Sequence, residues 1–246
     1  MKHRVSLTVP SYLCRSDDTL HIDGLAALMG EAAWQHARSF GVAFTEEEVQ
    51  QFWILHRLGF RVLRSPRWGE EITIETWPSR VRRLFAMREF LISTDGETLV
   101  EASSAWIILD AATRRPVRPE NHLAPDWRVE EVPLEMPTGK LGGIDEGTAT
   151  ALRDDARWYP VRESDIDRNG HVNNARYVQW LEDAAPATPD GITLVSFLAE
   201  THAGQEYTVI AGENGDPTEV WTRGGSGTEE QAPPVCAGRR STLPTS

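Results

Sequence analysis

Two stretches of the chain carry apolar residues at the spacing of an amphipathic helix. In the first half, this 3.6-residue period runs through residues 25–40. In the second half, it resumes at Tyr177 and continues through Leu181 to Ala185. We therefore expect one long helix in each half of the chain.

Strand-like runs surround both helices. Thr94-Asp95-Gly96 has the composition of a hairpin turn between two such runs, and Val235-Cys236-Ala237 is the only strand signal in the loop-like tail of residues 224–246. The predicted strands are residues 7–15, 71–77, 84–93 and 99–109 in the first half, and residues 156–163 and 193–201 in the second.

The two halves follow the same order, which predicts an internal repeat. Each has a strand, a long helix and antiparallel strands around a similar turn, at Gly69 and at Gly204. His21 lines up with His171, because each precedes its helix. Residues 129–152 are rich in Pro, Gly and acids, so we predict domains at 1–128 and 153–246 joined by a linker at 129–152.

Composition excludes several classes of function. The chain has 246 residues, and its net charge of -12 argues against a nucleic-acid partner. No apolar run approaches the roughly 20 residues that span a bilayer, so no membrane partner is expected. The N-terminus has no signal or transit pattern, and Cys14 and Cys236 form no disulfide framework. We therefore expect a cytoplasmic protein.

Polar residues of chemical interest gather just before the second helix. Asp167, Asn169 and His171 lie within five positions of one another, with Gly170 between the last two. Free backbone N–H groups at a helix start can stabilise an oxyanion, so we expect the amides of Gly170 and His171 to serve that purpose. The simpler alternative is a helix cap with a surface histidine, which explains one polar side chain but not several.

The same segment resembles the Asp-x-x-Gly-His-Val-Asn-Asn-x-x-Tyr signature of hotdog-fold thioesterases. With Asn two residues after the Asp, it is similar to the acyl-ACP thioesterase family of bacteria and plants, where ACP is acyl carrier protein. The resemblance runs over about residues 5–220. Further matching segments are residues 20–25, 30–37, 53–55, 66–71, 76–77, 84–88, 104–106 and 113–116.

This resemblance implies an α+β fold of two tandem hotdog units, each a long helix wrapped by an antiparallel sheet. It also implies a catalytic Glu at Glu200, where plant members usually carry a Cys next, at the position of Thr201. We therefore expect attack by water held by Glu200 and Asn169. His171 would polarise the carbonyl or carry the proton, and Asp167 would orient the site or act as a second base.

A metal-dependent site is the alternative to this mechanism. Asp167, His171, Glu200 and His202 could offer two carboxylates and two imidazoles, the last two residues on one face of a strand. The chain lacks a His-x-x-x-His or Cys-pair motif that would support metal binding. The prediction is a site with no metal and no cofactor.

The resemblance also places the acyl chain in the first half and an acyl carrier protein against a basic face. Candidate pocket residues are Leu25, Met29, Trp53 and Leu55, for which core packing is the alternative role. Arginines that could dock the acidic carrier are Arg80, Arg82, Arg83, Arg114 and Arg115, for which solvated loops and strand ends are the alternative.

The sequence thus predicts hydrolysis of fatty acyl-ACP to free fatty acid and holo-ACP. An acyl-CoA thioesterase is the nearest alternative, because the short signature is shared, and a non-catalytic acyl-binding hotdog module is the second. Doubling within one chain replaces the usual hotdog dimer, so a monomer and a homodimer both stay open.

Overall fold

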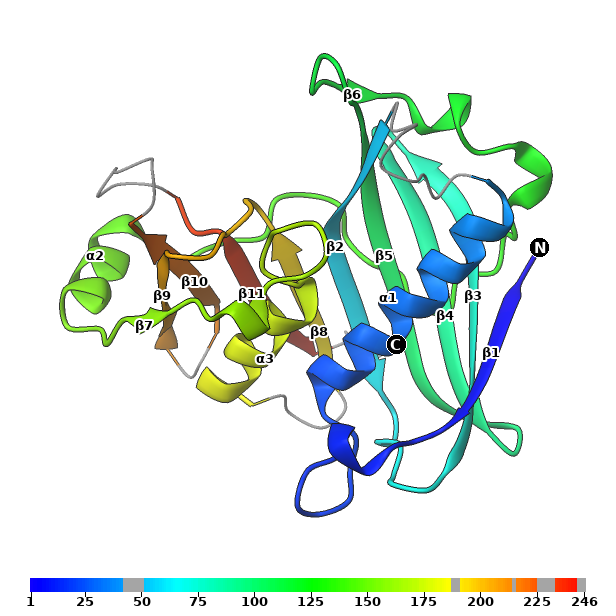
Figure 1. The fold of residues 1–246 in the computed structure, drawn as a ribbon, viewed down its shortest axis with the longest axis horizontal. Helices are drawn as coiled ribbons and strands as arrows, with labels where there is room; N and C mark the ends of the chain where they lie inside the picture. The colour runs from blue at the N-terminus through cyan, green and yellow to red at the C-terminus, as the bar shows by residue number, and fades with distance from the viewer. Residues whose placement is uncertain (42–50, 187–190, 214–215, 225–232, 243–246) are drawn as a thin grey trace. The chain divides into compact units, whose positions relative to one another are not determined.

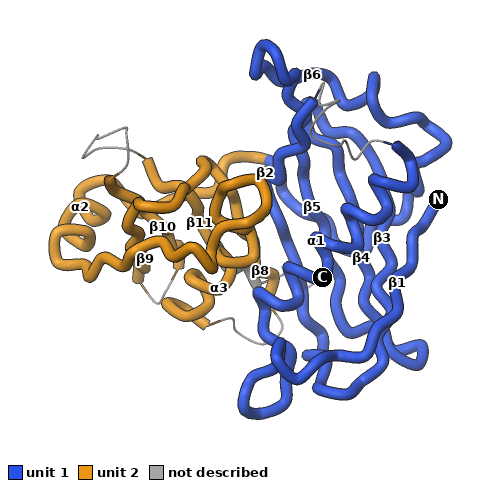
Figure 2. The backbone as a smooth tube through the Cα atoms, in the orientation of Figure 1, with its two compact units in different colours: residues 1–138 blue, residues 139–246 orange. Residues whose placement is uncertain are grey.

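The computed structural model describes residues 1–41, 51–186, 191–213, 216–224 and 233–242. The chain forms two compact units, unit 1 with residues 1–138 and unit 2 with residues 139–246 (Figure 2). Their boundary falls within the predicted linker of residues 129–152. Among the described residues, no helix is both long and apolar enough to cross a bilayer.

Unit 1 is a long helix, α1 (Ile22–Ser39), on one face of an antiparallel sheet (Figure 1). The sheet order is β1-β3-β4-β5-β2, and β6 pairs with β5. Short 3-10 turns lie at Ser11–Leu13, Pro119–Asn121 and Pro125–Trp127. The strands are β1 (His3–Thr8), β2 (Gln51–Val62), β3 (Glu71–Arg82), β4 (Phe85–Thr94), β5 (Glu97–Asp110) and β6 (Pro116–Val117).

Helix α1 confirms the first helix predicted from apolar periodicity. The residues on its buried side recur at three- and four-residue steps: they are Leu25, Met29, Ala32, Ala33 and His36. The two alanines are small enough for the helix backbone to approach the sheet closely. The same face therefore carries both the core of unit 1 and one buried histidine.

The predicted hairpin turn is also confirmed. Asp95 and Gly96 have φ of 43° and 82°, the left-handed conformation that a two-residue hairpin turn requires. The prediction of a strand over residues 7–15 is wrong after Thr8. Pro10 has no N–H to give to a strand ladder, and the 3-10 turn at Ser11–Leu13 follows it.

A segment of the predicted linker belongs to unit 1. We call residues 129–138 the strap. The Trp77 indole donates to the carbonyl of Glu131 (2.9 Å), and the Arg57 guanidinium donates to that of Pro137. Leu134 and Met136 are buried. Strand alternation puts Trp77 on the sheet face opposite to the α1 side, so the strap covers that second face.

Unit 2 repeats the arrangement at smaller size. Its sheet order is β8-β11-β10-β9-β7, and α3 packs against β9 and β10. The fold is therefore the predicted α+β double hotdog. The elements are α2 (Glu146–Asp154), β7 (Tyr159–Pro160), a 3-10 turn (Glu163–Asp165), α3 (Asn174–Ala184), β8 (Gly191–Phe197), β9 (Glu206–Ala211), β10 (Thr218–Arg223) and β11 (Cys236–Thr242).

Three elements of unit 2 differ from the sequence prediction. Helix α2 lies partly in the predicted linker, where the Asp145 side chain caps it by accepting from the Thr148 N–H. The predicted strand over residues 156–163 shrinks to β7, since Pro160 cannot extend the ladder. The predicted strand over residues 193–201 ends at Phe197. The tail strand is confirmed as β11, whereas residues 225–232 and 243–246 lie outside the described residues.

Candidate active site

The segment before α3 folds into a tight loop held by its own backbone. The Asp167 N–H donates to the His171 carbonyl (2.8 Å), and the Gly170 N–H donates to the Asp167 carbonyl (3.0 Å). Gly170 has φ of 79°, which a residue without Cβ adopts at little cost. The Val172 N–H then donates to the Thr201 carbonyl (2.8 Å), which joins this loop to the segment after β8.

The second predicted helix is confirmed as α3, which begins at Asn174. Asn173 is the N-cap, and its side chain accepts from the Ala175 N–H (2.9 Å). The loop of Asp167 to His171 therefore precedes the helix, as the sequence predicted. Two backbone amides were predicted to stabilise the oxyanion. The Gly170 amide already donates to the Asp167 carbonyl within the loop, so it is not available for this role. The role of the His171 amide stays a prediction.

Asp167 and Asn169 form a pair of their own. The Asn169 N–H donates to Oδ1 of Asp167 (2.8 Å), and the Asn169 side-chain amide donates to Oδ2 (3.3 Å). Both oxygens of the carboxylate are thus turned toward Asn169. These two hydrogen bonds hold the Asn169 side chain in one orientation, which a group that positions a water molecule needs.

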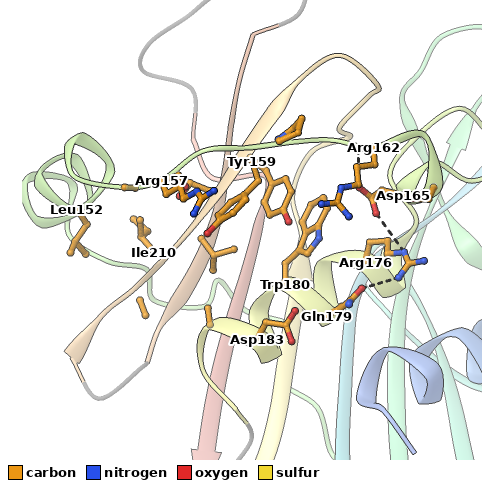
Figure 3. A pocket seen from close by; sticks show the side chains of 18 residues that line it. Leu152, Arg157, Tyr159, Arg162, Asp165, Arg176, Gln179, Trp180, Asp183 and Ile210 are labelled. Carbon is orange, nitrogen blue, oxygen red and sulfur yellow. Dashed lines mark hydrogen bonds and ion pairs between the residues drawn. The ribbon is translucent and has the colours of Figure 1, made fainter. Parts of the chain in front are cut away.

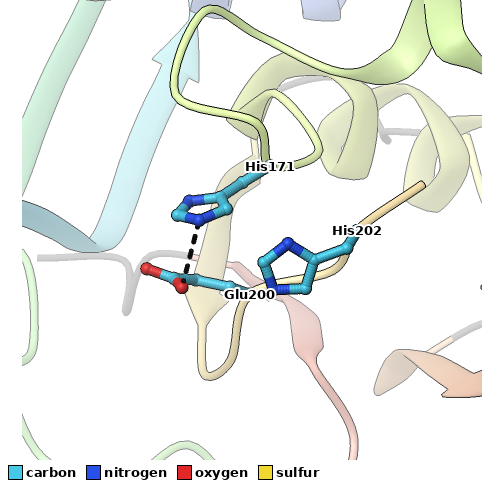
Figure 4. A group of neighbouring side chains, drawn as sticks. All are labelled: His171, Glu200 and His202. Atoms are coloured by element: carbon cyan, nitrogen blue, oxygen red, sulfur yellow. Dashed lines mark ion pairs between the residues drawn. The ribbon is translucent and has the colours of Figure 1, made fainter. Parts of the chain in front are cut away.

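His171 and Glu200 face each other (Figure 4). Nε2 of His171 lies 3.4 Å from Oε2 of Glu200, and the two side chains are 33% and 49% exposed. His202 lies beside them, with its ring centroid 4.8 Å from that of His171 and its plane nearly perpendicular. The predicted placement of Glu200 and His202 on one strand face is wrong, because β8 ends at Phe197 and both side chains come from the loop that follows.

Two buried side chains, Thr201 and Tyr177, lie next to the segment that carries Glu200. Thr201, at the position where a Cys was expected, is fully buried. Tyr177 of α3 is buried as well, which raises the pKa of its hydroxyl above the ordinary range, and its contact with Thr201 offsets part of that effect. The loop that carries Glu200 is therefore anchored to the helix that follows His171.

Unit 1 contains the same loop with different side chains. The bridge between Cys14 and Leu20 matches that between Ile166 and Val172. The backbone hydrogen bonds within the second loop have counterparts in the first at an offset of 152 residues. The Leu20 N–H also donates to the Pro66 carbonyl as the Val172 N–H donates to that of Thr201, and these two acceptors are 135 residues apart. By these pairings Arg15, Asp17, Thr19 and Ser65 occupy the places of Asp167, Asn169, His171 and Glu200.

This correspondence corrects the predicted match of His21 with His171. The His21 N–H donates to the Leu13 carbonyl as the Asn173 N–H donates to that of Asp165, and each residue is an N-cap. His21 therefore takes the place of Asn173. Among the described loops of the two units, the imidazole–carboxylate pair belongs to unit 2.

The predicted acyl-pocket residues share one layer of unit 1. Leu25 and Met29 are buried on α1. The register of β2 with β5 puts Trp53 and Leu55 on the sheet face that carries Arg88, whose guanidinium reaches His36 of α1 (3.1 Å). The two sheet residues thus lie on the face of the sheet that α1 covers, and Leu25 and Met29 lie on the buried side of α1.

The predicted docking arginines divide into two groups. Arg80 and Arg82 both pair with Glu135 of the strap, so their charge is matched within unit 1. Arg83 lies at the β3–β4 turn with φ of 57°. Arg114 stacks over the Phe52 ring (4.6 Å), and the last of the five, Arg115, follows it in the turn between β5 and β6.

Sequence reasoning missed a pocket of about 740 Å³ in unit 2 (Figure 3). It is lined by a stack of Trp180 on Tyr207, with ring centroids 3.7 Å apart, and by Tyr159, which lies next to Tyr207. Arg162 and Arg176 also line the pocket, and Arg176 pairs with Asp165 (3.8 Å). The signal available in the sequence was the set of aromatic residues on α3, β7 and β9, which no single motif connects.

Comparisons with known proteins agree over most of the chain. Residues 1–125 match the acyl-ACP thioesterase N-terminal domain, and residues 150–214 match the acyl-ACP thioesterase C-terminal domain. A chloroplastic palmitoyl-acyl carrier protein thioesterase of Cuphea hookeriana is 29% identical over 196 residues, which are 74% of this chain and 46% of the plant protein. The chain thus spans about half the length of the curated relatives it matches.

Solved structures share the fold of the whole chain. An acyl-ACP thioesterase from Bacteroides thetaiotaomicron has a TM-score of 0.77 at 22% identity and covers 97% of this chain and 96% of its own. A 12:0-ACP thioesterase from Umbellularia californica has a TM-score of 0.74 at 21% identity, with the same two coverages. Together with the two domain matches, which include half of the chain in the first alone, these results show that the chain belongs to the acyl-ACP thioesterase family.

Proposed function

We propose that the chain hydrolyses the thioester of a fatty acyl group on acyl carrier protein, releasing free fatty acid and holo-ACP. The observation that carries this proposal is the pair of His171 and Glu200, 3.4 Å apart on two loops tied together by the Val172–Thr201 hydrogen bond. Family membership supports the substrate, because the relatives matched are named as thioesterases of acyl carrier protein.

Water is the proposed nucleophile. Cys236 is fully buried and Cys14 belongs to unit 1, and burial raises the pKa of both thiols. A thiol kept protonated is a poor nucleophile. Glu200 is open to solvent and can take a proton from a water that Asn169 helps to hold.

Hydrolysis then proceeds through an oxyanion intermediate. The water oxygen bonds to the thioester carbon while its proton passes to Glu200, and the carbonyl oxygen becomes an oxyanion near the His171 N–H. Collapse of this intermediate breaks the carbon–sulfur bond. The leaving thiolate of the pantetheine arm takes a proton from the Glu200–His171 pair, which returns the site to its starting state. Asp167 acts as a positioning residue, because both its oxygens hold Asn169.

The test is turnover of the variants Glu200→Gln and His171→Ala on acyl-ACP. General acid–base groups contribute roughly 10²- to 10⁴-fold, so we expect kcat to fall by at least about 100-fold in each. The dissociation constant of acyl-ACP, measured with each inactive variant, should stay close to the value for the wild-type chain. The control is His21→Ala, which removes an exposed imidazole of unit 1 whose side chain makes no cap hydrogen bond, and it should leave kcat unchanged. A fully active Glu200→Gln enzyme would remove this mechanism.

Carrier preference needs its own measurement. We propose that Arg83, Arg114 and Arg115 help to recognise the acidic carrier protein, since Arg80 and Arg82 are paired with Glu135. With matched acyl chains, kcat/KM should be higher on acyl-ACP than on acyl-CoA, and the difference should shrink as salt is added. Equal values on both substrates would favour the acyl-CoA alternative. A cytoplasmic location remains a proposal, supported by the two free thiols.

A further inference from the structure

Three side chains of the proposed site offer ligand atoms that converge. One nitrogen each of His171 and His202 and one carboxylate oxygen of Glu200 all lie within 4.8 Å of one another (Figure 4). His202 has no part in the hydrolysis proposed above. Two imidazoles and one carboxylate form a ligand set that zinc uses in hydrolytic proteins, with a fourth position left to water.

The spacing is close to what such an ion needs. A zinc ion about 2.0 Å from each ligand in a tetrahedron holds those ligands about 3.3 Å apart. His171 Nε2 and Glu200 Oε2 are already 3.4 Å apart. His202 is exposed, so its ring can close the remaining distance by rotation about its side-chain bonds.

The surroundings of His202 favour a metal ligand. Its Nδ1 lies 3.4 Å from the Gly170 carbonyl, and in the tautomer that protonates Nδ1 this atom donates to that carbonyl. Histidines that bind metals usually donate their other ring N–H in this way, which directs the Nε2 lone pair to the ion. The backbone N–H of His202 also donates to the Gln205 side chain (2.7 Å), which holds the residue in place.

We propose that His171, Glu200 and His202 bind one divalent transition-metal ion of the zinc type, and that the bound ion inhibits hydrolysis. Imidazole nitrogens select zinc, cobalt or nickel over magnesium and calcium, which prefer all-oxygen sites. The inhibition rests on the proposed function, because the ion occupies the Glu200 lone pair and the His171 nitrogen that hydrolysis requires. Binding itself does not rest on it.

Binding is measured first, on the full chain stripped with a chelator and then dialysed. Titration calorimetry with ZnCl₂ should give one site, and CoCl₂ should produce the visible absorption of a four-coordinate ion. His202→Gln should weaken zinc binding at least about tenfold, since even outer partners of metal ligands are worth 10- to 100-fold. The control His21→Gln removes a solvent-exposed histidine from unit 1 and should not change the affinity.

Activity is measured second, on acyl-ACP. Zinc should inhibit the wild-type chain at the concentration at which it binds, and excess chelator should restore turnover. His202→Gln, scaled to its own metal-free rate, should need at least about tenfold more zinc for half inhibition.

The outcomes separate the two proposals. Absence of zinc binding, or equal binding by wild type and His202→Gln, overturns the metal site whatever the activity. One-site binding that depends on His202, in a chain with no turnover at any metal concentration, supports the metal site and overturns the proposed function. Turnover that zinc stimulates supports binding and overturns the inhibition.

Discussion

Glu89 is a fully buried carboxylate, and its burial predicts how the stability of unit 1 depends on pH. The side chain lies on β4, on the face covered by the strap, and is 0% exposed. The Ser79 hydroxyl donates to its Oε1 (2.6 Å). Burial raises the pKa of Glu89 to about 7, and the hydrogen bonds and the charge of Arg80 offset only part of that shift.

The magnitude follows from the two protonation states. Compared with the ordinary glutamate pKa of 4.5, a folded-state pKa of about 7 is equivalent to roughly 3 kcal/mol between the two protonation states. Because the pKa of Glu89 is raised in the folded chain, the free energy of unfolding falls as the pH rises. The folded chain holds a proton that the unfolded chain releases, so the stability is full below the unfolded pKa and is lost as the pH rises through about 7.

The substitution Glu89→Gln removes the ionisation and keeps the shape and the acceptor for Ser79. We expect the variant to be more stable than wild type by about 2–3 kcal/mol at pH 8 and to differ by less than about 1 kcal/mol at pH 5. The assay is urea unfolding followed by circular dichroism between pH 5 and pH 8. Hydrogen exchange of β3, β4 and β5 assigns the change to unit 1.

The control is Glu101→Gln. Glu101 lies on the neighbouring strand β5, and its partly exposed carboxylate pairs with Arg61 of β2. This control should keep the pH slope of the wild type, whatever its effect on overall stability. Parallel stability curves for wild type and Glu89→Gln from pH 5 to pH 8 would refute the reasoning, because a buried carboxylate that titrates near neutrality must bend the wild-type curve.

Three further substitutions test the frame of the site. Asn173→Ala removes the cap of α3 and should cost about 1 kcal/mol in chemical unfolding. Gly170→Ala places a Cβ at φ of 79°, so we expect a loss of about 1–2 kcal/mol together with a lower kcat from the displaced loop. Gly238→Ala puts a Cβ 3.1 Å from Cδ1 of Leu181 and should lower stability by roughly 1–3 kcal/mol without a change in KM; an unchanged melting temperature would show that Leu181 moves aside freely.

Local patterns predicted the elements that depend on local physics. The periodicity of residues 25–40 predicted α1, because its buried face is set by residues three and four apart. The turn at Asp95 and Gly96 was predicted for a similar reason, since its conformation needs residues that tolerate positive φ. The signature around His171 located the loop that precedes α3, which begins at Asn174.

Features that depend on residues far apart in the chain could not be predicted from the sequence. The strap was interpreted as a linker, yet Trp77 and Arg57, more than 50 positions away, bind its backbone. Helix α2 was missed because the Gly and Pro content around it hid the cap that Asp145 provides. Nothing in its own neighbourhood shows that Glu89 is buried between Ser79 and Ser103, whose places come from the pairing of three strands.

The repeated loop explains why chemistry and folding can be separated in this chain. Both copies are shaped by the same backbone hydrogen bonds, a residue with positive φ and an N-cap at the start of a helix. Thr19 and Ser65 occupy that frame in unit 1 as well as His171 and Glu200 do in unit 2. The frame therefore does not need the imidazole or the carboxylate to fold. Loss of turnover after substituting either one can be assigned to chemistry, because unit 1 shows the loop closing without them.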